Sequence, residues 1–418
     1  ENRELGSEGR KRVQQIRLDF AADWFGLDKD RIRFANHHMS HACFGYLSNP
    51  LRGSGRDILA LTSDAGGDGA YESVWVFRNG KRALVHQGRT NIIATIYSYV
   101  TLILGMKINE HEYKVMGLAP YGRPQYKKII LEHLIDLKED GSFRMNQDYF
   151  DYIGGLTMTN KKFADLFGAP TRKPETKLTQ KEMDIAASLQ EVTEEIMLRM
   201  SRYARKLTGM KNLCLAGGVA LNCVGNGKIL KEKIFNELWI QPAAGDAGGA
   251  LGVAMCIWHQ VLGKDREVRK KDAMKGSYLG PCFTDEDVHK FLKSRKIPFR
   301  QLTNGELTRT VAHHIKVGKV VGWFQGRMEF GPRALGGRSI IGDARSPKMQ
   351  SIMNLKIKYR ESFRPFAPSV LEEKVSDWFD IEATSPYMLL VAKVRKDKRV
   401  DVLDEQKELF GIDLLNIP

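Results

Sequence analysis

Apolar positions along this chain follow two alternating patterns, short uninterrupted runs and longer stretches with helical spacing. The runs at 57–64, 74–80 and 212–218 end at Asp, Asn or Gly residues, which is typical of buried strands that lead into turns. The segment 179–207 instead has apolar residues at helical spacing and begins with a capping-box pair, Thr179 and Glu182. This alternation predicts an α/β fold, in which ligands bind at the carboxyl ends of strands.

Length and composition narrow the class of protein. The chain has 418 residues, of which 42% are hydrophobic and 28% are charged, and these values are typical of globular proteins. At roughly 150 residues per domain, the length predicts two or three folding units. The stretch 261–276 is charged and has few apolar residues, which makes it the best linker candidate. We therefore expect one domain over 1–262 and a second over 277–418.

The sequence gives no sign of a membrane protein or a secreted one. The longest apolar candidate, 92–106, is interrupted by Thr, Ser and Tyr, and the first residues contain no apolar signal region. The five cysteines form no CxxC pair, which favours a reduced compartment. We expect a cytoplasmic protein without a membrane partner.

The charge balance requires an anionic partner. Lys and Arg number 65 against 50 for Asp and Glu, so the net charge is +15. Basic chains of this kind bind nucleic acid, membrane surfaces, nucleotides or phosphorylated metabolites, and composition alone does not choose among them.

Two histidines in the segment NHHMSHA could hold a metal ion. His37 and His41 are four residues apart, so on a helix their rings project from one face. His38 points about 100° away from that face and is a candidate either for supporting the metal ligands or for contacting a substrate. Two surface or capping histidines would give the same spacing. Asp246, at a strand end just before a helix, is either a helix cap or a third ligand for the same metal.

Two glycine-rich segments follow predicted strands. In SDAGGDGA at 63–70, small residues allow backbone amides to approach a phosphate, and Asp64 or Asp68 could hold Mg²⁺. An ordinary glycine-rich hairpin is the alternative. In CLAGGVALN at 214–222, Gly217 and Gly218 could pass close under an adenosine, or could simply serve tight strand-to-helix packing.

Basic residues are densest at 326–347 and 355–370, where they lie among Gly, Pro and aromatic residues. Because the planar guanidinium matches phosphate and carboxylate oxygens in a bidentate manner, this composition predicts an anion pocket. A charged surface loop and a nucleic-acid groove, in which Phe330, Phe363 and Phe366 stack on bases, are the alternatives. The pocket candidates are Arg327, Arg333, Arg338, Arg345, Lys356, Lys358, Arg360 and Arg364.

Taken in order, the motifs are similar to those of the NodU/CmcH carbamoyltransferase family. They span residues 36 to 370 and comprise NHHMSHA, SDAGGDG, HEYKVMGLAPYG, LAGGVALN, QPAAGDAGGALG, GRMEFGPRALGGRS and KYRESFRPFAPSV. The resemblance implies an N-terminal domain of the actin and hexokinase ATPase (ASKHA) type, followed by an α+β domain of the YrdC-like type.

The resemblance also implies roles for individual residues. His37, His41 and Asp246 match the ligands of a divalent metal, usually iron, and His38 and Asp64 are the catalytic candidates. Asp64, Gly66 and Gly67 match the phosphate loop, and Gly217, Gly218 and Asn222 match the nucleotide loop. Residues that match the carbamoyl-phosphate pocket are Arg333, Arg338, Ser339, Arg360 and Arg364.

The chain departs from the family pattern in three places. Ala65 stands where the family has Gly, no strand with a phosphate loop precedes residue 36, and the chain stops at Pro418. We therefore expect this chain to be most of a larger two-domain enzyme that lacks both extreme termini.

The function that the resemblance implies is ATP-dependent O-carbamoylation. Carbamoyl phosphate would yield carbamate, which would form carbamoyl-adenylate with ATP and Mg²⁺, and the carbamoyl group would pass to a hydroxyl of a sugar-containing or secondary-metabolite acceptor. The expected partners are these small molecules and not nucleic acid. The alternatives are a tRNA-binding or tRNA threonylcarbamoyl-type protein, which the charge favours, and a non-catalytic nucleotide-dependent scaffold. The sequence leaves the acceptor and the oligomeric state open.

Overall fold

A computed structural model describes residues 7–50, 57–89, 93–151, 158–168, 170–265, 273–401, 403, 409 and 411–416. Its largest sheet has five strands in the order β3-β2-β1-β6-β7. The strands are β1 (Ile58–Gly67), β2 (Ala70–Arg78), β3 (Lys81–Gly88), β6 (Asn212–Ala216) and β7 (Glu237–Ile240). β1, β2 and β3 form antiparallel hairpins, whereas β6 and β7 run parallel to β1. The carboxyl ends of β1, β6 and β7 therefore lie at one edge of the sheet.

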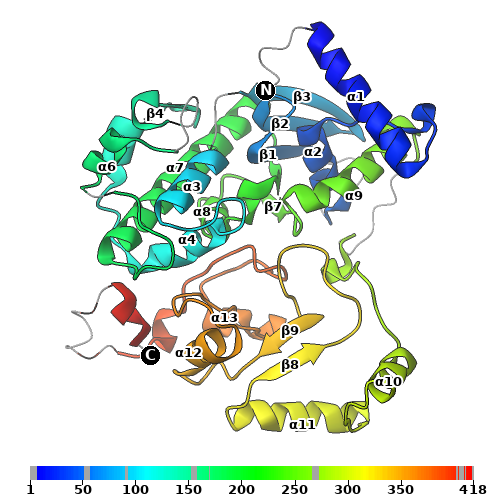
Figure 1. Ribbon diagram of the computed structural model, residues 1–418, viewed down its shortest axis with the longest axis vertical. Helices are drawn as coiled ribbons and strands as arrows, with labels where there is room; N and C mark the ends of the chain where they lie inside the picture. The colour runs from blue at the N-terminus through cyan, green and yellow to red at the C-terminus, as the bar shows by residue number, and fades with distance from the viewer. Residues whose placement is uncertain are drawn as a thin grey trace.

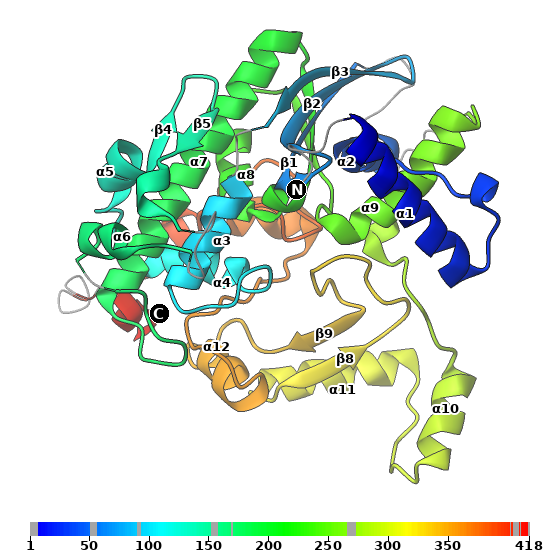
Figure 2. The same cartoon turned by 45° about the horizontal axis from the view of Figure 1, so that its top comes forward.

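Helices cover both faces of this sheet. α2 (His37–Ser48) packs on one face beside α9 (Asp246–Cys256), and α3 (Ile93–Ile103) and α7 (Gln180–Thr208) cover the other face (Figures 1 and 2). On the α2 side, Tyr46 stacks on Phe77 of β2 at 4.0 Å between ring centroids. α2 and α9 approach closely because Gly248 has no side chain: an added Cβ there would lie 2.6 Å from Cε1 of Phe44. This approach brings the first turns of the two helices together.

An insertion between α3 and α7 packs against the α7 side. It contains α4 (Glu112–Leu118), α5 (Lys127–Ile129), a two-stranded sheet of β4 (Ile135–Leu137) and β5 (Phe143–Met145), and α6 (Lys161–Leu166). Phe150, Phe163 and Phe167 form its aromatic core, with Phe163 and Phe167 4.7 Å apart between ring centroids. The segment 141–178 belongs to this insertion, although residues 152–157 and 169 lie outside the described part.

The C-terminal part is built on the hairpin of β8 (Val321–Phe324) and β9 (Arg338–Ile341). α10 (Asp285–Ser294) and α11 (Asn304–Lys316) precede the hairpin, and both begin with capping boxes. α12 (Met349–Ser351) and α13 (Val375–Trp378) follow it, and the chain ends with the 3₁₀ turn η11 (Gly411–Asn416). Figure 1 shows this part below the five-stranded sheet.

The chain returns to the N-terminal half near its end. Tyr387 and Leu389 are buried, and the Tyr387 ring meets Trp239 of β7 edge-on at 5.9 Å between centroids. This segment contacts α8 (Cys223–Lys231), the helix that follows β6. The two halves are therefore joined by packing contacts as well as by the chain at 261–276, of which 266–272 lies outside the described residues.

The predicted α/β alternation is confirmed, with small shifts at its ends. The run at 57–64 is β1, and the run at 74–80 is the end of β2 and a turn in which Asn79 and Gly80 both have positive φ. The helix over 179–207 is α7, and its predicted capping box forms. The helix expected just after Asp246 begins at Asp246 itself. Of the helices in the described ranges, none has both the length and the hydropathy that a bilayer crossing needs.

Candidate functional site

The first two turns of α2 carry the histidines of the NHHMSHA motif. Asn36 is the N-cap, and its side chain accepts a hydrogen bond from the Met39 amide at 2.9 Å. The Asp68 carboxylate accepts from the His37 amide at 2.7 Å and from the Asn36 side chain at 3.1 Å. Asp68, one of the two Mg²⁺ candidates, is therefore used to anchor the start of α2 to the β1–β2 hairpin.

Four side chains from three separate segments converge in front of this turn. His37 and His41 of α2 meet Asp64 of β1 and Asp246 of α9, and one ligand atom from each lies within 4.8 Å of the others. Nε2 of His41 is 2.9 Å from the Asp64 carboxylate and 3.5 Å from that of Asp246. The corresponding distances for Nε2 of His37 are 3.3 and 3.7 Å. The convergence of Asp246 with both histidines could not be read from their spacing.

Burial is uneven across this cluster. The His41 side chain is 1% exposed and that of Asp64 10%, whereas that of Asp246 is 78% exposed. Burial alone lowers the pKa of His41, but the carboxylates of Asp246 and Asp64 outweigh it and raise that pKa to about 9. Burial raises the pKa of Asp64, but the neighbouring His37 and His41 lower it below its usual range. The cluster is therefore a buried charge pair that is open on its Asp246 side.

This donor set fits a divalent metal ion. Within the described part of the chain, neither ring nitrogen of buried His41 has a hydrogen bond of regular geometry, although Nε2 faces two carboxylates. A buried imidazole without hydrogen bonds is costly unless another ligand satisfies it. Two imidazole nitrogens with two carboxylate oxygens are donors for Fe²⁺, Mn²⁺ or Zn²⁺, and they leave coordination positions open for a substrate.

The His38 ring lies 5.2 Å from that of His37 between centroids, but it is buried in the protein interior. Its Nε2 is 3.0 Å from the Ala70 carbonyl, and its Nδ1 is 2.8 Å from Oγ1 of Thr62. Because a carbonyl only accepts, Nε2 carries the proton and Nδ1 accepts from Thr62. Ser73 and Trp75 extend this chain of hydrogen bonds on β2. Both nitrogens of His38 are thus used to hold α2 on the hairpin, and this geometry gives His38 a positioning role.

Two glycines of the SDAGGDG segment leave room for neighbouring side chains. The segment forms the antiparallel β1–β2 hairpin, with a bulge between Ser63 and Gly67. A glycine-rich hairpin is the alternative to a phosphate-binding loop at this segment. An added Cβ at Gly67 would lie 2.6 Å from Cβ of His37, and one at Gly66 would lie 2.7 Å from the Tyr71 ring. Gly67 therefore leaves the space that the His37 side chain occupies, and Gly66 leaves the space that the Tyr71 ring occupies.

The Gly217–Asn222 segment connects β6 to α8 through the 3₁₀ turn η5 (Gly218–Leu221). Gly217 has φ 89°, and an added Cβ would lie 2.9 Å from the Ser63 nitrogen. Gly218 lies beside Asp64, since its added Cβ would be 3.1 Å from Oδ1. This segment therefore borders the histidine–carboxylate cluster, and both glycines are needed for tight packing there.

Asn222 is part of a buried amide network. Its Oδ1 caps α8 by accepting from the Gly225 amide at 3.0 Å, and its side chain exchanges two 3.1 Å hydrogen bonds with Gln190 of α7. The Tyr97 hydroxyl donates to Gln190 at 3.0 Å. Asn222 thus uses its side-chain oxygen twice and one of its side-chain N–H groups for hydrogen bonds within the protein.

The residues of the predicted anion pocket have hydrogen-bond partners in several segments of the chain. Arg333 reaches the N-terminal half, where Nη2 donates to the Leu221 carbonyl at 3.0 Å. Arg338 donates to the carbonyls of Gln325, Gly326 and Gly337, and its guanidinium lies 3.5 Å from the centroid of the Phe324 ring. Oγ of Ser339 accepts from the Gly336 amide at 2.9 Å.

Arg360 and Arg364 form a cationic cluster with α4. The Arg364 guanidinium lies 4.3 Å from the centroid of the Tyr113 ring, and Lys114 pairs with Glu361 at 2.7 Å. Burial, then the charge of Arg364, lowers the pKa of Arg360. Burial, with the charges of Arg360 and Arg364, likewise lowers the pKa of Lys358. Of these four basic side chains, Lys114 and Arg364 pair with Glu361, and the surplus of positive charge is available to an anion.

Two residues that support the candidate site, Glu329 and Gln190, were not predicted from the sequence. The Glu329 carboxylate accepts from the amides of Leu335 and Gly337, each at 2.7 Å, and so shapes the arginine-rich loop. Gln190 lies in the middle of α7 and reads as a helix-face residue. Glu329 could have been noticed as an acidic residue inside an arginine-rich loop, whereas Gln190 has no such signal.

Fold and site together define a class of α/β protein in which a histidine–carboxylate cluster faces a basic second half. Residues 5–255 match the family described as Carbamoyltransferase N-terminus, and residues 312–406 match Carbamoyltransferase C-terminus. The chain belongs to the carbamoyltransferase family.

Relatives support this membership. The chain is 36% identical to Nodulation protein NolNO of Sinorhizobium fredii, over 89% of this chain and 53% of that protein. It is also 36% identical to Nodulation protein NolO of Bradyrhizobium diazoefficiens, over 87% of this chain and 64% of that protein. Identity to the Uncharacterized protein sll1178 of Synechocystis is 54%, over 94% of this chain and 63% of that protein. The chain thus spans less than two thirds of the length of each.

Among solved structures, full-length HypF in a phosphate- and nucleotide-bound form is similar at 14% identity and a TM-score of 0.30. The match covers 59% of this chain and 49% of HypF.

Proposed function

We propose that this chain carries the catalytic parts of an ATP-dependent O-carbamoyltransferase. The observation that carries the proposal is the convergence of His37, His41, Asp64 and Asp246 in a chain of the carbamoyltransferase family. The proposed division of labour places carbamoyl transfer in a domain over 1–262, and carbamoyl-phosphate binding in a YrdC-like domain over 277–418.

The proposed reaction has three steps. Carbamoyl phosphate and water give carbamate and inorganic phosphate. A carbamate oxygen attacks the α-phosphorus of ATP, which gives carbamoyl-adenylate and releases pyrophosphate. The acceptor hydroxyl then attacks the carbamoyl carbon, loses its proton, and displaces AMP, so that the acceptor becomes a carbamate ester.

His37, His41, Asp64 and Asp246 would hold the divalent metal, for which iron is our proposal. When bound, the metal supplies a Lewis acid for the carbamoyl carbonyl oxygen. The 78% exposure of the Asp246 side chain leaves the approach to the cluster open. The buried carboxylate of Asp64 stays ionised because of its two histidines, so it can orient a polar substrate group as well as a metal.

The cationic cluster of Lys114, Lys358, Arg360 and Arg364 is the proposed seat of the carbamoyl-phosphate anion. Guanidinium and ammonium groups stabilise a doubly charged phosphate and its departure. The partial burial that lowers the pKa of Arg360 also strengthens its attraction for an anion. The proposed nucleotide contacts are the backbone of Gly217 and Gly218, with Mg²⁺ carried by ATP itself.

A radiolabel assay tests this function. The protein is incubated with ¹⁴C-labelled carbamoyl phosphate, ATP, Mg²⁺, Fe²⁺ and a panel of hydroxyl acceptors, and we expect pyrophosphate release together with labelled carbamoyl-adenylate. Removing Arg360 and Arg364 should abolish the use of carbamoyl phosphate. Formation of neither pyrophosphate nor carbamoyl-adenylate by the full-length protein would refute the proposal. A His37→Ala variant that keeps both metal and activity would contradict the metal assignment.

A further inference from the structure

The turn η5 is held from the C-terminal half as well as from its own half. Arg333 donates to the carbonyl of Leu221, the last residue of the turn, at 3.0 Å. Asn226 of α8 donates from its side-chain nitrogen to the Ala220 carbonyl at 2.8 Å and to the Leu389 carbonyl at 3.1 Å. A single amide group thus bridges the turn and the returning segment 387–391.

Asn226 is buried, and both of its side-chain N–H groups are used in this bridge. The side chain is fully buried, and its Oδ1 has no hydrogen-bond partner among the described residues. Its two N–H groups are both directed at carbonyl oxygens of other segments. A buried amide with an unsatisfied oxygen costs free energy, and the two hydrogen bonds that Asn226 donates offset this cost.

The returning segment fits closely against α8. An added Cβ at Gly227 would lie 2.8 Å from the Val391 carbonyl oxygen, so this backbone approaches the helix where a glycine allows it. Trp239 and Tyr387 pack edge-to-face beside this contact. A displacement of segment 387–391 is therefore transmitted to α8 and, through Asn226, to η5.

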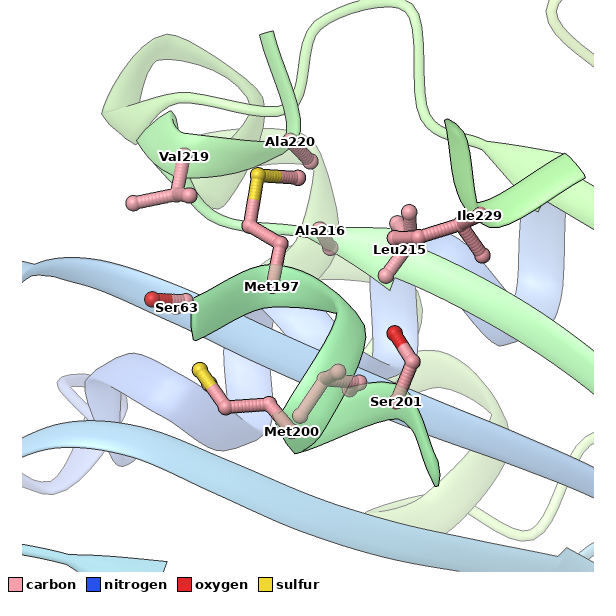
Figure 3. A pocket seen from close by; sticks show the side chains of 10 residues that line it. Ser63, Met197, Met200, Ser201, Leu215, Ala216, Val219, Ala220 and Ile229 are labelled. Atoms are coloured by element: carbon pink, nitrogen blue, oxygen red, sulfur yellow. The ribbon is translucent and has the colours of Figure 1, made fainter. Parts of the chain in front are cut away.

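The side chains underneath the turn leave a small cavity. Figure 3 shows Val219 and Ala220 of η5 across from Met197 of α7, and these side chains line a small cavity. The hydroxyls of Ser63 and Ser201, which also line the cavity, have no hydrogen-bond partner in the described part of the chain. The cavity leaves some packing contacts unmade beneath the turn. The hydrogen bonds from Asn226 and Arg333 therefore contribute to the position of the turn.

We propose that Asn226 is a positioning residue that sets η5, and with it the nucleotide-contacting backbone, according to where the C-terminal half is seated. This inference rests on the proposed function for the claim that η5 contacts ATP. It predicts that nucleotide affinity and the order of segment 387–391 change together.

The test compares Asn226→Asp with Lys231→Ala in the full chain. Aspartate keeps the shape of asparagine but puts acceptor oxygens where both donors were, whereas Lys231 is an exposed residue of the same helix. We expect Asn226→Asp to raise amide hydrogen exchange at least about tenfold in both 218–222 and 387–391 without ligand. We also expect the Kd of adenosine 5′-(β,γ-imido)triphosphate and the KM for ATP to rise at least about tenfold, with kcat within about twofold.

The outcomes separate the two proposals. Wild-type protein that does not bind the nucleotide analogue would refute the proposed function, while the exchange data would still test the bridge. Exchange that rises only at 218–222, or an analogue affinity equal to that of the wild type, would overturn the role of Asn226. If Asn226→Asp does not fold, Gly227→Ala takes its place. That variant displaces Val391 without touching the amide, and the same paired rise in exchange is expected.

Discussion

Replacing Gly67 with alanine isolates the geometry of the proposed metal site from its chemistry. Gly67 does not have the positive φ that only glycine adopts readily, so alanine keeps the backbone and adds one methyl group. That methyl carbon would lie 2.6 Å from Cβ and 2.5 Å from Cδ2 of His37. Comfortable carbon–carbon contacts are about 3.5–4.0 Å, so the His37 side chain must move by about 1 Å.

A movement of this size is large for a metal ligand. Ligand distances are held to within about 0.2 Å, and disturbing the support of a ligand costs about 10–100-fold in metal affinity. We therefore expect Gly67→Ala to bind Fe²⁺ or Mn²⁺ at least about tenfold more weakly while it remains folded. Anaerobic calorimetric titration measures the affinity, and circular dichroism confirms the fold.

The matched control is Gly249→Ala, three residues beyond Asp246 on α9. An added Cβ there meets nothing within 4 Å, so metal affinity should equal that of the wild type. If Gly67→Ala and Gly249→Ala bind metal equally well, His37 is not a ligand in the position that the structure gives it, and the reasoning fails.

Three further predictions concern positioning, pH and partners. His38→Ala leaves the Ala70 carbonyl without its histidine donor, while the Thr62 hydroxyl stays bonded to Ser73, and we expect a loss of about 1–3 kcal/mol in urea unfolding, against a much smaller loss if His38 faces solvent. Hydrogen bonding to Glu72 raises the pKa of His86. The stability that His86 contributes is therefore complete below its unfolded pKa of about 6.5 and is lost as pH rises through the folded pKa. A thermal midpoint that falls between pH 6 and 8 more in the wild type than in His86→Asn supports this pairing, and equal falls contradict it. Finally, tRNA binding measured by filter retention should disappear at about 0.15 M salt, because the proposed anion is a small molecule, and binding that survives would favour the tRNA alternative.

Local sequence patterns determined the elements of this protein. Apolar runs ending at Asp or Gly located β1 and β6, and the capping box located the start of α7. Helical spacing placed His37 and His41 on one face of α2. These features depend on neighbours within about four residues, so the chain encodes them without reference to its fold.

Only the tertiary structure decided which candidates meet. Asp64 and Asp246 are 182 positions apart, and they reach the histidines because β1 lies beside β6 and α9 packs on α2 through Gly248. Arg333 and Arg364 have partners in different segments, the Leu221 carbonyl and the Glu361 carboxylate, which their positions in the sequence did not indicate. His38 and Asn222 had the right chemistry for a site, but burial committed both to hydrogen bonds within the protein. Spacing along a chain fixes the direction of a side chain on its own element, whereas contacts between elements depend on long-range packing, which no local pattern records.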